Sequence, residues 1–272
     1  VQAGIVMLKS STGDIVAVGA GRNKKGESTF NFATMTKKQI GSTSKPLYDY
    51  GPGIEYNNWS TYQLFADEPH SYSDGGNVNN ADGRYNGLLT MREALKLSRN
   101  IPAIKAFQSL KSSDILSFVK SLGLSPDMSQ GILFETHAIG GYTGESPLTL
   151  AAAYAAFSNG GYYVEPRSFT KIVYRDTDEV YEVKTAPQKV MSEETAYMIS
   201  DMLVTTASYY TGRTTVNGVT YGLKTGTTDY DRATKKAYKL PGNATNDLWV
   251  AGITPDYSMA LWLSLINISE PT

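Results

Sequence analysis

The chain has 272 residues, enough to bury the core of one large domain or of two closely packed lobes. Its 25 basic and 26 acidic side chains leave a net charge of -1, which provides no field for binding a polyanion, so we expect no nucleic-acid partner. The absence of cysteine excludes disulfides, thiolate catalysis and cysteine-ligated metals.

The amino-terminal residues predict a β-hairpin. Residues 4–10 and 14–20 are apolar, β-rich runs, and the Ser-Thr-Gly sequence between them is a turn signal. Beyond Ser42 the pattern becomes mostly helical, with long polar connections. Residues 71–87 are rich in Gly, Asn and Asp, which predicts an exposed loop.

Capping signals mark the helices of the middle region. Thr90 followed by Glu93 forms a capping box, and a break at residues 98–100 separates this first helix from the next. Similar signals predict helices over residues 90–97, 101–110, 113–123, 146–161 and 192–207.

Strand patterns return after the helices. A second hairpin is predicted over residues 168–176 and 179–185, and further strands over 219–228, 247–254 and 258–265. Strands at both ends around a helical middle indicate an α+β fold in which the terminal segments share one sheet and the helices form a second lobe. A cleft between the two is the natural place for a site.

Ser42-Thr43-Ser44-Lys45 offers two candidate nucleophiles. A helix that begins near Ser42 places Lys45 one turn away on the same face, whereas Ser44 faces elsewhere. Pro46 is tolerated only in a first helical turn, which supports that start. Helix amides there favour a developing oxyanion, and Lys45 can act as a base only when it is neutral.

The Ser-x-x-Lys pattern alone does not separate a nucleophile from a polar helix start. It also begins at Ser117, within an amphipathic helix, and at Ser168, at the start of a strand, where we interpret both as surface features. Two rarer patterns are more informative. Ser98-Arg99-Asn100 lies in the break between two helices, where it either faces a cleft or caps the second helix.

Lys224-Thr225-Gly226-Thr227 follows a strand pattern. A lysine and two hydroxyls along a strand edge suit a substrate carboxylate, and Gly226 allows a substrate backbone to approach closely. The alternative is an edge strand that ends in a turn.

These three motifs, in this order, resemble the active-site motifs of the penicillin-recognising serine transpeptidase and β-lactamase superfamily. The amino-terminal hairpin, residues 41–47, the alanine-rich helix at 146–161 and residues 247–262 are similar to the transpeptidase domain of bifunctional, class A penicillin-binding proteins. The resemblance covers nearly the whole chain and implies a β-lactamase/transpeptidase-like fold, with an antiparallel sheet flanked by helices.

The resemblance implies a catalytic role for five residues. Ser42 attacks the carbonyl between two terminal D-alanines of a peptidoglycan stem peptide and forms an acyl-enzyme, while Lys45 takes the serine proton. Ser98 relays a proton to the leaving amine and Asn100 orients the substrate amide. Lys224 supplies positive potential, and an amine of a second stem peptide resolves the acyl-enzyme.

It also implies how the substrate is held. The hydroxyls of Thr225 and Thr227 bind the terminal carboxylate, and the backbone amides of Ser42 and Thr227 form the oxyanion hole. We place Tyr230 near the cleft. No cofactor or metal is expected, because His70 and His137 lack metal-ligand spacing and are interpreted as loop residues.

The same resemblance predicts one transpeptidase domain over residues 1–272, with a sheet lobe of about 1–40 and 165–264 and a helical lobe of about 41–164. Residues 265–272 match no feature of the family and are expected to be a truncated or non-native tail. In the full-length protein an amino-terminal segment is expected to anchor the domain at the extracytoplasmic face of the bacterial membrane. Expected partners are stem peptides, β-lactam antibiotics and proteins of cell-wall synthesis and division.

Two alternatives share the three motifs. A serine β-lactamase would need a glutamate to activate a deacylating water, but the spacing of Glu135 and Glu145 marks neither as that base, and class A β-lactamases carry Ser-Asp-Asn rather than Ser-Arg-Asn. A β-lactam sensor domain would bind covalently without turnover. The likeness of the whole chain to a cross-linking domain favours the transpeptidase.

Overall fold

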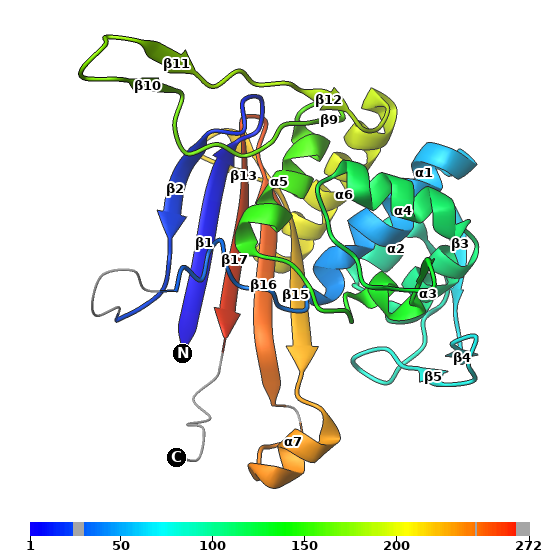
Figure 1. Ribbon diagram of the computed structural model, residues 1–272. Helices are drawn as coiled ribbons and strands as arrows, with labels where there is room; N and C mark the ends of the chain where they lie inside the picture. Colours follow the sequence, from blue (N-terminus) through cyan, green and yellow to red (C-terminus); the bar gives the residue numbers. More distant parts are fainter. Residues whose placement is uncertain (24–29, 243, 265–272) are drawn as a thin grey trace.

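A five-stranded antiparallel sheet, built from both ends of the chain, forms one side of the molecule (Figure 1). The computed structural model describes residues 1–23, 30–242 and 244–264, so the predicted tail at 265–272 lies outside the described residues. The strand order is β15-β16-β17-β1-β2. Their bounds are β1 Gln2–Lys9, β2 Ile15–Gly19, β15 Gly222–Asp229, β16 Thr245–Ile253 and β17 Tyr257–Ser264.

The pairing of β1 with β17 joins the two ends of the chain. It runs from Gln2 opposite Ser264 to Lys9 opposite Tyr257. Alternate residues of β16 and β17 are buried, as expected for strands with one face on a core. This arrangement confirms the predicted sharing of one sheet by the terminal segments.

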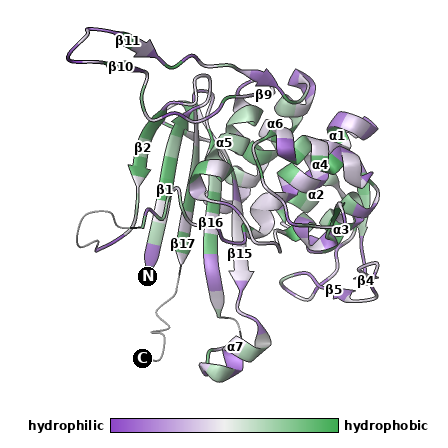
Figure 2. Ribbon diagram, viewed as in Figure 1, coloured by the Kyte–Doolittle hydropathy of each residue, from purple (hydrophilic) through white to green (hydrophobic). Residues whose placement is uncertain are grey.

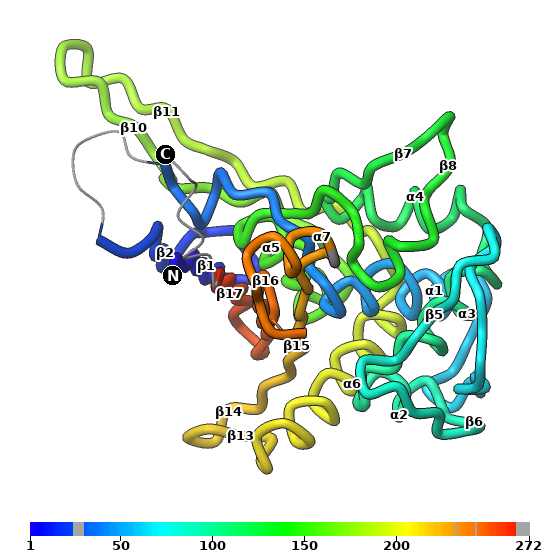
Figure 3. The backbone as a smooth tube through the Cα atoms, turned by 90° about the horizontal axis from the view of Figure 1, so that it is seen from below, coloured from blue at the N-terminus to red at the C-terminus, as the bar shows by residue number. Residues whose placement is uncertain are grey.

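Helices cover one face of this sheet (Figures 1 and 3). Helix α5 packs on β1, β16 and β17, and α6 packs on β15. Figure 2 shows α5 as strongly apolar, and nine of its residues are buried. The helices are α1 Gly51–Asn57, α2 Met91–Lys96, α3 Asn100–Gln108, α4 Ser112–Ser121, α5 Pro147–Ser158, α6 Glu193–Thr211 and α7 Arg232–Ala237.

Short elements complete the chain. The two-stranded pairs are β3 Leu64–Asp67 with β6 Gly87–Thr90, β4 His70–Ser71 with β5 Asn77–Val78, β7 Met128–Ser129 with β8 Ile132–Leu133, β9 Tyr162–Tyr163 with β12 Gln188–Lys189, β10 Lys171–Val173 with β11 Val180–Glu182, and β13 Thr215–Val216 with β14 Val219–Thr220. No helix of the described residues is long and apolar enough to cross a bilayer.

Local capping signals were good predictors of helix starts. The Thr90 hydroxyl accepts from the Glu93 N–H at 3.2 Å, and Ser146 and Ser192 cap α5 and α6 in the same way. The amino-terminal hairpin and the β10–β11 hairpin are also present where the sequence predicts them.

Two predictions need correction, and one helix was not predicted. The segment after Ser42 is not the start of an α-helix: a 3-10 turn, η1 Gly41–Ser44, leads into a π-helical turn, η2 Pro46–Tyr50, before α1 begins. The connection over residues 71–87 is only partly exposed, because Val78 and Asn80 are buried. Helix α7 was not predicted, since its short polar sequence has no apolar face.

Gly4 offers a test of the packing at the sheet. A Cβ atom there would lie 2.4 Å from the carbonyl oxygen of Phe32, whose ring stacks on buried Trp262 with centroids 5.7 Å apart. We expect Gly4→Ala to lower the free energy of unfolding by about 2 kcal/mol, because backbone must move to admit the methyl group.

Gly252→Ala in β16 is the matched control, since a Cβ there meets its nearest atom at an ordinary 3.5 Å. It should change the free energy of unfolding by less than about 0.5 kcal/mol. Urea denaturation measures both variants, and equal losses for the two would contradict this account of the packing.

Candidate active site

A cleft of about 620 Å³ lies between β15 and the helices. It brings together residues that are far apart in the sequence, and it is lined in part by Ser42, Asn79, Asn80, Asp82, Ser98, Arg99, Asn100, Ile139, Tyr210, Thr225, Thr227 and Asp229. Members of all three motifs therefore face the same space.

The segment that carries Ser42 is fixed by backbone contacts. Gly41 has a φ of +54°, and a Cβ atom on it would lie 2.6 Å from the carbonyl oxygen of Thr227, so only glycine lets η1 rest against β15. From the other side, the Tyr154 hydroxyl donates to the Thr43 carbonyl at 2.7 Å. Ser44 is fully buried and its hydroxyl donates to Ala138, which leaves Ser42 as the serine at the cleft.

The Ser98 hydroxyl lies between two buried lysines. Lys45 Nζ is 3.4 Å from Ser98 Oγ and donates to the Ser98 carbonyl at 2.7 Å and to Asn100 Oδ1 at 2.9 Å. Lys224 Nζ donates to the same Oγ at 2.8 Å and to the Thr225 carbonyl at 2.9 Å. Because a hydroxyl can accept from one amine while donating to another, Ser98 can carry a proton between the two.

Burial changes the protonation of both lysines. Desolvation lowers the pKa of Lys45 to about 7, against an opposing attraction from Asp49. Lys224 is also fully buried, and desolvation together with the nearby Lys45 charge holds its pKa well below the usual range. A neutral amine is therefore accessible at ordinary pH.

Asp49 is a buried carboxyl four residues beyond Lys45. Neither of its oxygens has a hydrogen-bond partner among the described residues. Burial raises its pKa well above the usual range, although Lys45 opposes this. An unpartnered carboxylate in such a place is costly, so burial shifts Asp49 toward its neutral form while the Lys45 charge shifts it toward the carboxylate.

The Ser98-Arg99-Asn100 turn leads into α3 and is held by side chains and backbone from another part of the chain, residues 79 and 80. Ser98 does not cap α3: the N-cap position is Arg99, whose side chain makes no capping bond. Instead Asn80 Oδ1 accepts from the N–H of Asn100 at 2.8 Å. Asn100 Nδ2 donates to the Asn79 carbonyl at 2.9 Å and retains a second hydrogen for another acceptor.

The residues of β15 divide between the cleft and the core. Thr225 and Thr227 line the cleft, whereas Gly226 is buried against η1, where a Cβ atom would lie 2.2 Å from the Ile40 carbonyl oxygen. Gly226 thus allows the chain itself, rather than a ligand, to approach β15. Tyr230 is not among the residues that line the cleft, but Tyr210 of α6 is.

Other candidate groups lie away from the cleft. Glu135 accepts hydrogen bonds from Ser73, and Glu145 is buried; neither lines the cleft. His137 is not a loop residue, because it is fully buried in the 3-10 turn η3 Glu135–Ile139 and stacks on Tyr142 with centroids 4.6 Å apart. Within the part of the chain that is described, no group of three or more His, Asp or Glu side chains could hold a metal ion.

Comparison with known proteins decides the family. The family described as "Penicillin binding protein transpeptidase domain" matches residues 3–272. The chain belongs to this family. The resemblance to class A penicillin-binding proteins is confirmed, and this transpeptidase domain has curated relatives in several bacteria.

The relatives are similar over nearly all of this transpeptidase domain. It is 41% identical to penicillin-binding protein 1A/1B of Bacillus subtilis, over 97% of this chain and 29% of that protein. It is 34% identical to penicillin-binding protein 1A of Streptococcus pneumoniae, over 99% of this chain and 39% of that protein. The chain therefore spans less than half the length of these relatives.

Solved structures share the fold. PonA1 of Mycobacterium tuberculosis in complex with penicillin V has a TM-score of 0.84 at 22% identity, over 99% of this chain and 70% of that chain. Penicillin-binding protein 1A of Haemophilus influenzae has a TM-score of 0.80 at 24% identity, over 98% of this chain and 43% of that chain. The predicted α+β, β-lactamase/transpeptidase-like fold is confirmed.

Gly41 tests how strictly the serine segment is held. We expect Gly41→Ala to lower the free energy of unfolding by about 2–3 kcal/mol, because it combines a left-handed backbone with a clash against Thr227.

Gly218→Ala separates the two causes. Gly218 has a φ of +80° but open space around it. Gly218→Ala should therefore lower the free energy of unfolding only by the cost of backbone strain, about 1 kcal/mol. Urea denaturation compares the two variants, and an equal cost would show that the contact with β15 contributes nothing.

Proposed function

We propose that this transpeptidase domain is a serine D,D-transpeptidase that cross-links peptidoglycan stem peptides through an acyl-enzyme on Ser42. The observation that supports this most directly is the position of Ser98 Oγ, 2.8 Å from Lys224 Nζ and 3.4 Å from Lys45 Nζ, in the cleft that Ser42 also lines. Ser42, Lys45 and Ser98 thus offer a nucleophile, a base and a proton carrier, and Lys224 adds a cation beside the carrier.

Acylation begins with the neutral form of Lys45. Its amine takes the proton of Ser42 as the Ser42 oxygen attacks the carbonyl between two terminal D-alanines. Protonated Lys45 then passes a proton to Ser98 Oγ, 3.4 Å away, as the Ser98 hydroxyl gives its own proton to the departing amine of the last D-alanine. Lys224, in its protonated form, offsets negative charge that develops in the cleft.

The substrate is held by groups on β15 and η1. The hydroxyls of Thr225 and Thr227, both at the cleft, bind the terminal carboxylate. The backbone amides of Ser42 and Thr227 form the oxyanion hole, which the close approach of Gly41 to Thr227 supports. Asn100 orients the substrate amide with the free hydrogen of its Nδ2.

The acyl group then passes to an amine of a second stem peptide, which forms the cross-link. β-Lactams acylate the same serine and leave slowly. Deacylation by water, as in a β-lactamase, is disfavoured because neither Glu135 nor Glu145 lines the cleft. We retain the β-lactam sensor as the second candidate, since it requires the same acylation without transfer.

We also propose that the chain works as one domain at the extracytoplasmic face of the membrane, as part of a longer anchored protein. The share of the relatives that it covers, 29% and 39%, is consistent with such a protein. Cell-wall synthesis and division proteins are its candidate partners there.

The nucleophile can be tested with a fluorescent penicillin. Ser42→Ala should abolish a label that survives denaturation, whereas Ser44→Ala should retain it, because the Ser44 hydroxyl is buried against Ala138. Gel fluorescence and intact-protein mass measure the adduct. Persistent labelling of the Ser42→Ala protein would refute the assignment.

Transfer can be measured separately with a stem-peptide donor and an amine acceptor. Formation of a cross-linked product favours the transpeptidase, whereas acylation without transfer favours the sensor. Rapid release of hydrolysed β-lactam would favour a β-lactamase.

The pH dependence of acylation tests Lys45. Because burial lowers its pKa to about 7, the neutral base is lost as the pH falls through this value, and the acylation rate constant should fall about tenfold per pH unit below it. Stopped-flow labelling between about pH 5 and 9 measures this, with circular dichroism as a control for folding. A rate that is flat across this range would contradict the role of Lys45.

A further inference from the structure

Arg99 takes no part in the proposed chemistry, yet it is only 6% exposed. Its guanidinium contacts Asp67 at the end of β3 and two groups on the connection from β3 to β6. Nε donates to Asp67 Oδ2 at 2.8 Å, Nη1 to Asp82 Oδ2 at 2.9 Å, and Nη2 to the carbonyl of Arg84. A planar fork of five donors can hold three acceptors at once, which a lysine cannot do in the same geometry.

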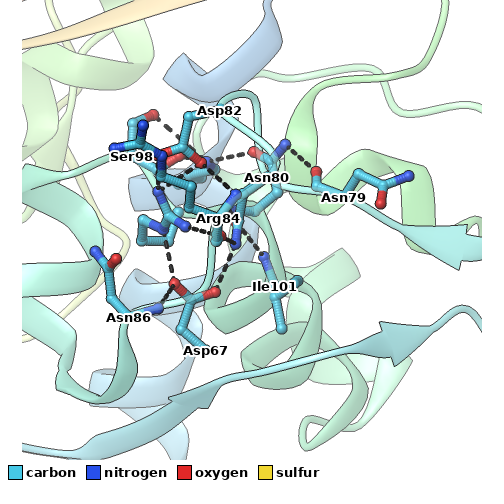
Figure 4. Close-up of polar contacts among 11 residues, drawn as sticks. Asp67, Asn79, Asn80, Asp82, Arg84, Asn86, Ser98 and Ile101 are labelled. Carbon is cyan, nitrogen blue, oxygen red and sulfur yellow. Dashed lines mark hydrogen bonds and ion pairs between the residues drawn. The ribbon is translucent and has the colours of Figure 1, made fainter.

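Asp67 links Arg99 to other buried polar groups. Its side chain is fully buried, and it accepts from Asn80 Nδ2 at 2.6 Å and from the N–H of Asn86 at 3.0 Å, in addition to Arg99. Asn80 in turn binds the backbone of Asn100 at 2.8 Å. The connection between β3 and β6 and the Ser98-Arg99-Asn100 turn are therefore tied at two points, through Arg99 and through Asn80. Figure 4 shows Asp67, Asn80 and Asp82 gathered beside Ser98.

Ser98 has a backbone that needs such support. Its φ is +55°, in the left-handed region that a residue other than glycine occupies only when its surroundings hold it there. In this conformation the Ser98 carbonyl meets Lys45 Nζ at 2.7 Å while Oγ meets Lys224 Nζ at 2.8 Å. A turn that relaxed would move the hydroxyl out of the space between the two amines.

We propose that Arg99 is a positioning residue for acylation. By bridging Asp67 and Asp82, it holds Ser98 between the two lysines and holds residues 79–82 as a wall of the cleft. This inference rests on the proposed function, because it concerns acylation at the same site.

Arg99 also acts on Lys45 through its charge. Four charged or titratable groups face Lys45: Asp49 of its own segment, Asp67 at the end of β3, Arg99, and Lys224 of β15. Loss of the Arg99 charge raises the pKa of Lys45, whereas loss of the Asp67 charge lowers it. The two substitutions should therefore shift the pH profile in opposite directions, which a merely structural role would not do.

The test measures the second-order rate constant for acylation by a fluorescent penicillin against pH. Arg99→Gln should reduce the acylation rate constant by about 10- to 100-fold at alkaline pH, where the rate is at its plateau. It should also move the fall in rate on the acidic side of the profile, called the acidic limb, to higher pH. Asp67→Asn should also reduce the rate but move the limb to lower pH. Arg99→Lys should not restore the rate, because one ammonium cannot bridge both carboxylates.

Asp82→Asn replaces Arg99→Gln as the test if the latter fails to fold, and Arg92→Gln serves as a control for both. Asp82→Asn removes the charge from the outer ion pair with Arg99. Because the Asp82 side chain is 49% exposed, this variant should slow acylation without lowering the melting temperature. Arg92→Gln is the matched control. It breaks a 2.5 Å ion pair between Arg92 and Asp201, neither of which lines the cleft, and should leave acylation unchanged.

The outcomes separate the two proposals. Absence of acylation in the unchanged protein would contradict the proposed function. If the unchanged protein is acylated, a wild-type acylation rate in Arg99→Gln or Asp82→Asn would overturn the inference about Arg99. The same holds if the acidic limbs of the pH–rate profiles of Arg99→Gln and Asp67→Asn move in the same direction.

Discussion

The burial of two lysine amines around one hydroxyl is the constraint on which the site depends. Lys45 and Lys224 are both fully buried, and each lies within 3.4 Å of Ser98 Oγ. Two ammonium charges this close, away from water, repel each other and lose hydration, so the site favours loss of a proton. The chemistry we propose needs that neutral amine next to a serine.

Three separate parts of the fold must meet to create this arrangement. The sheet edge supplies Lys224, the residue after the η1 turn is Lys45, and the turn before α3 supplies Ser98. Glycines make the meeting possible, because the backbone of Gly41 rests on Thr227 and that of Gly226 rests on Ile40. Close backbone contact fixes the distances that long lysine side chains alone would leave variable.

Local signals in the sequence were sufficient for much of the fold. The apolar, β-rich runs of residues 4–10 and 14–20 and the turn signal between them predicted a hairpin, and Thr90, Ser146 and Ser192 marked three helix starts, because strand propensity, turns and capping depend on neighbouring residues. The order of the three motifs selected Ser42 over Ser44. The structure agrees in burying Ser44 and leaving Ser42 at the cleft.

Features that depend on distant residues were not predictable in this way. Nothing near Arg99 in the sequence indicates that Asp67 and Asp82 bind it, or that Asn80 caps α3. The 3-10 turn η1 likewise depends on contacts with β15 and α5, and the π-helical turn η2 on contacts with α3 and α4, rather than on local propensity. The place of Tyr210 at the cleft follows from the packing of α6 on β15.

The proposed acylation requires the Lys45 amine to be neutral in a large fraction of molecules at ordinary pH. An NMR titration of ¹⁵N-labelled lysine Nζ, with Lys45 assigned by its absence from a Lys45→Arg protein, measures this directly. We expect a transition near pH 7, in line with a pKa of about 7 for the buried amine. A Lys45 signal that titrates only near the ordinary lysine value of about 10.4 would contradict it.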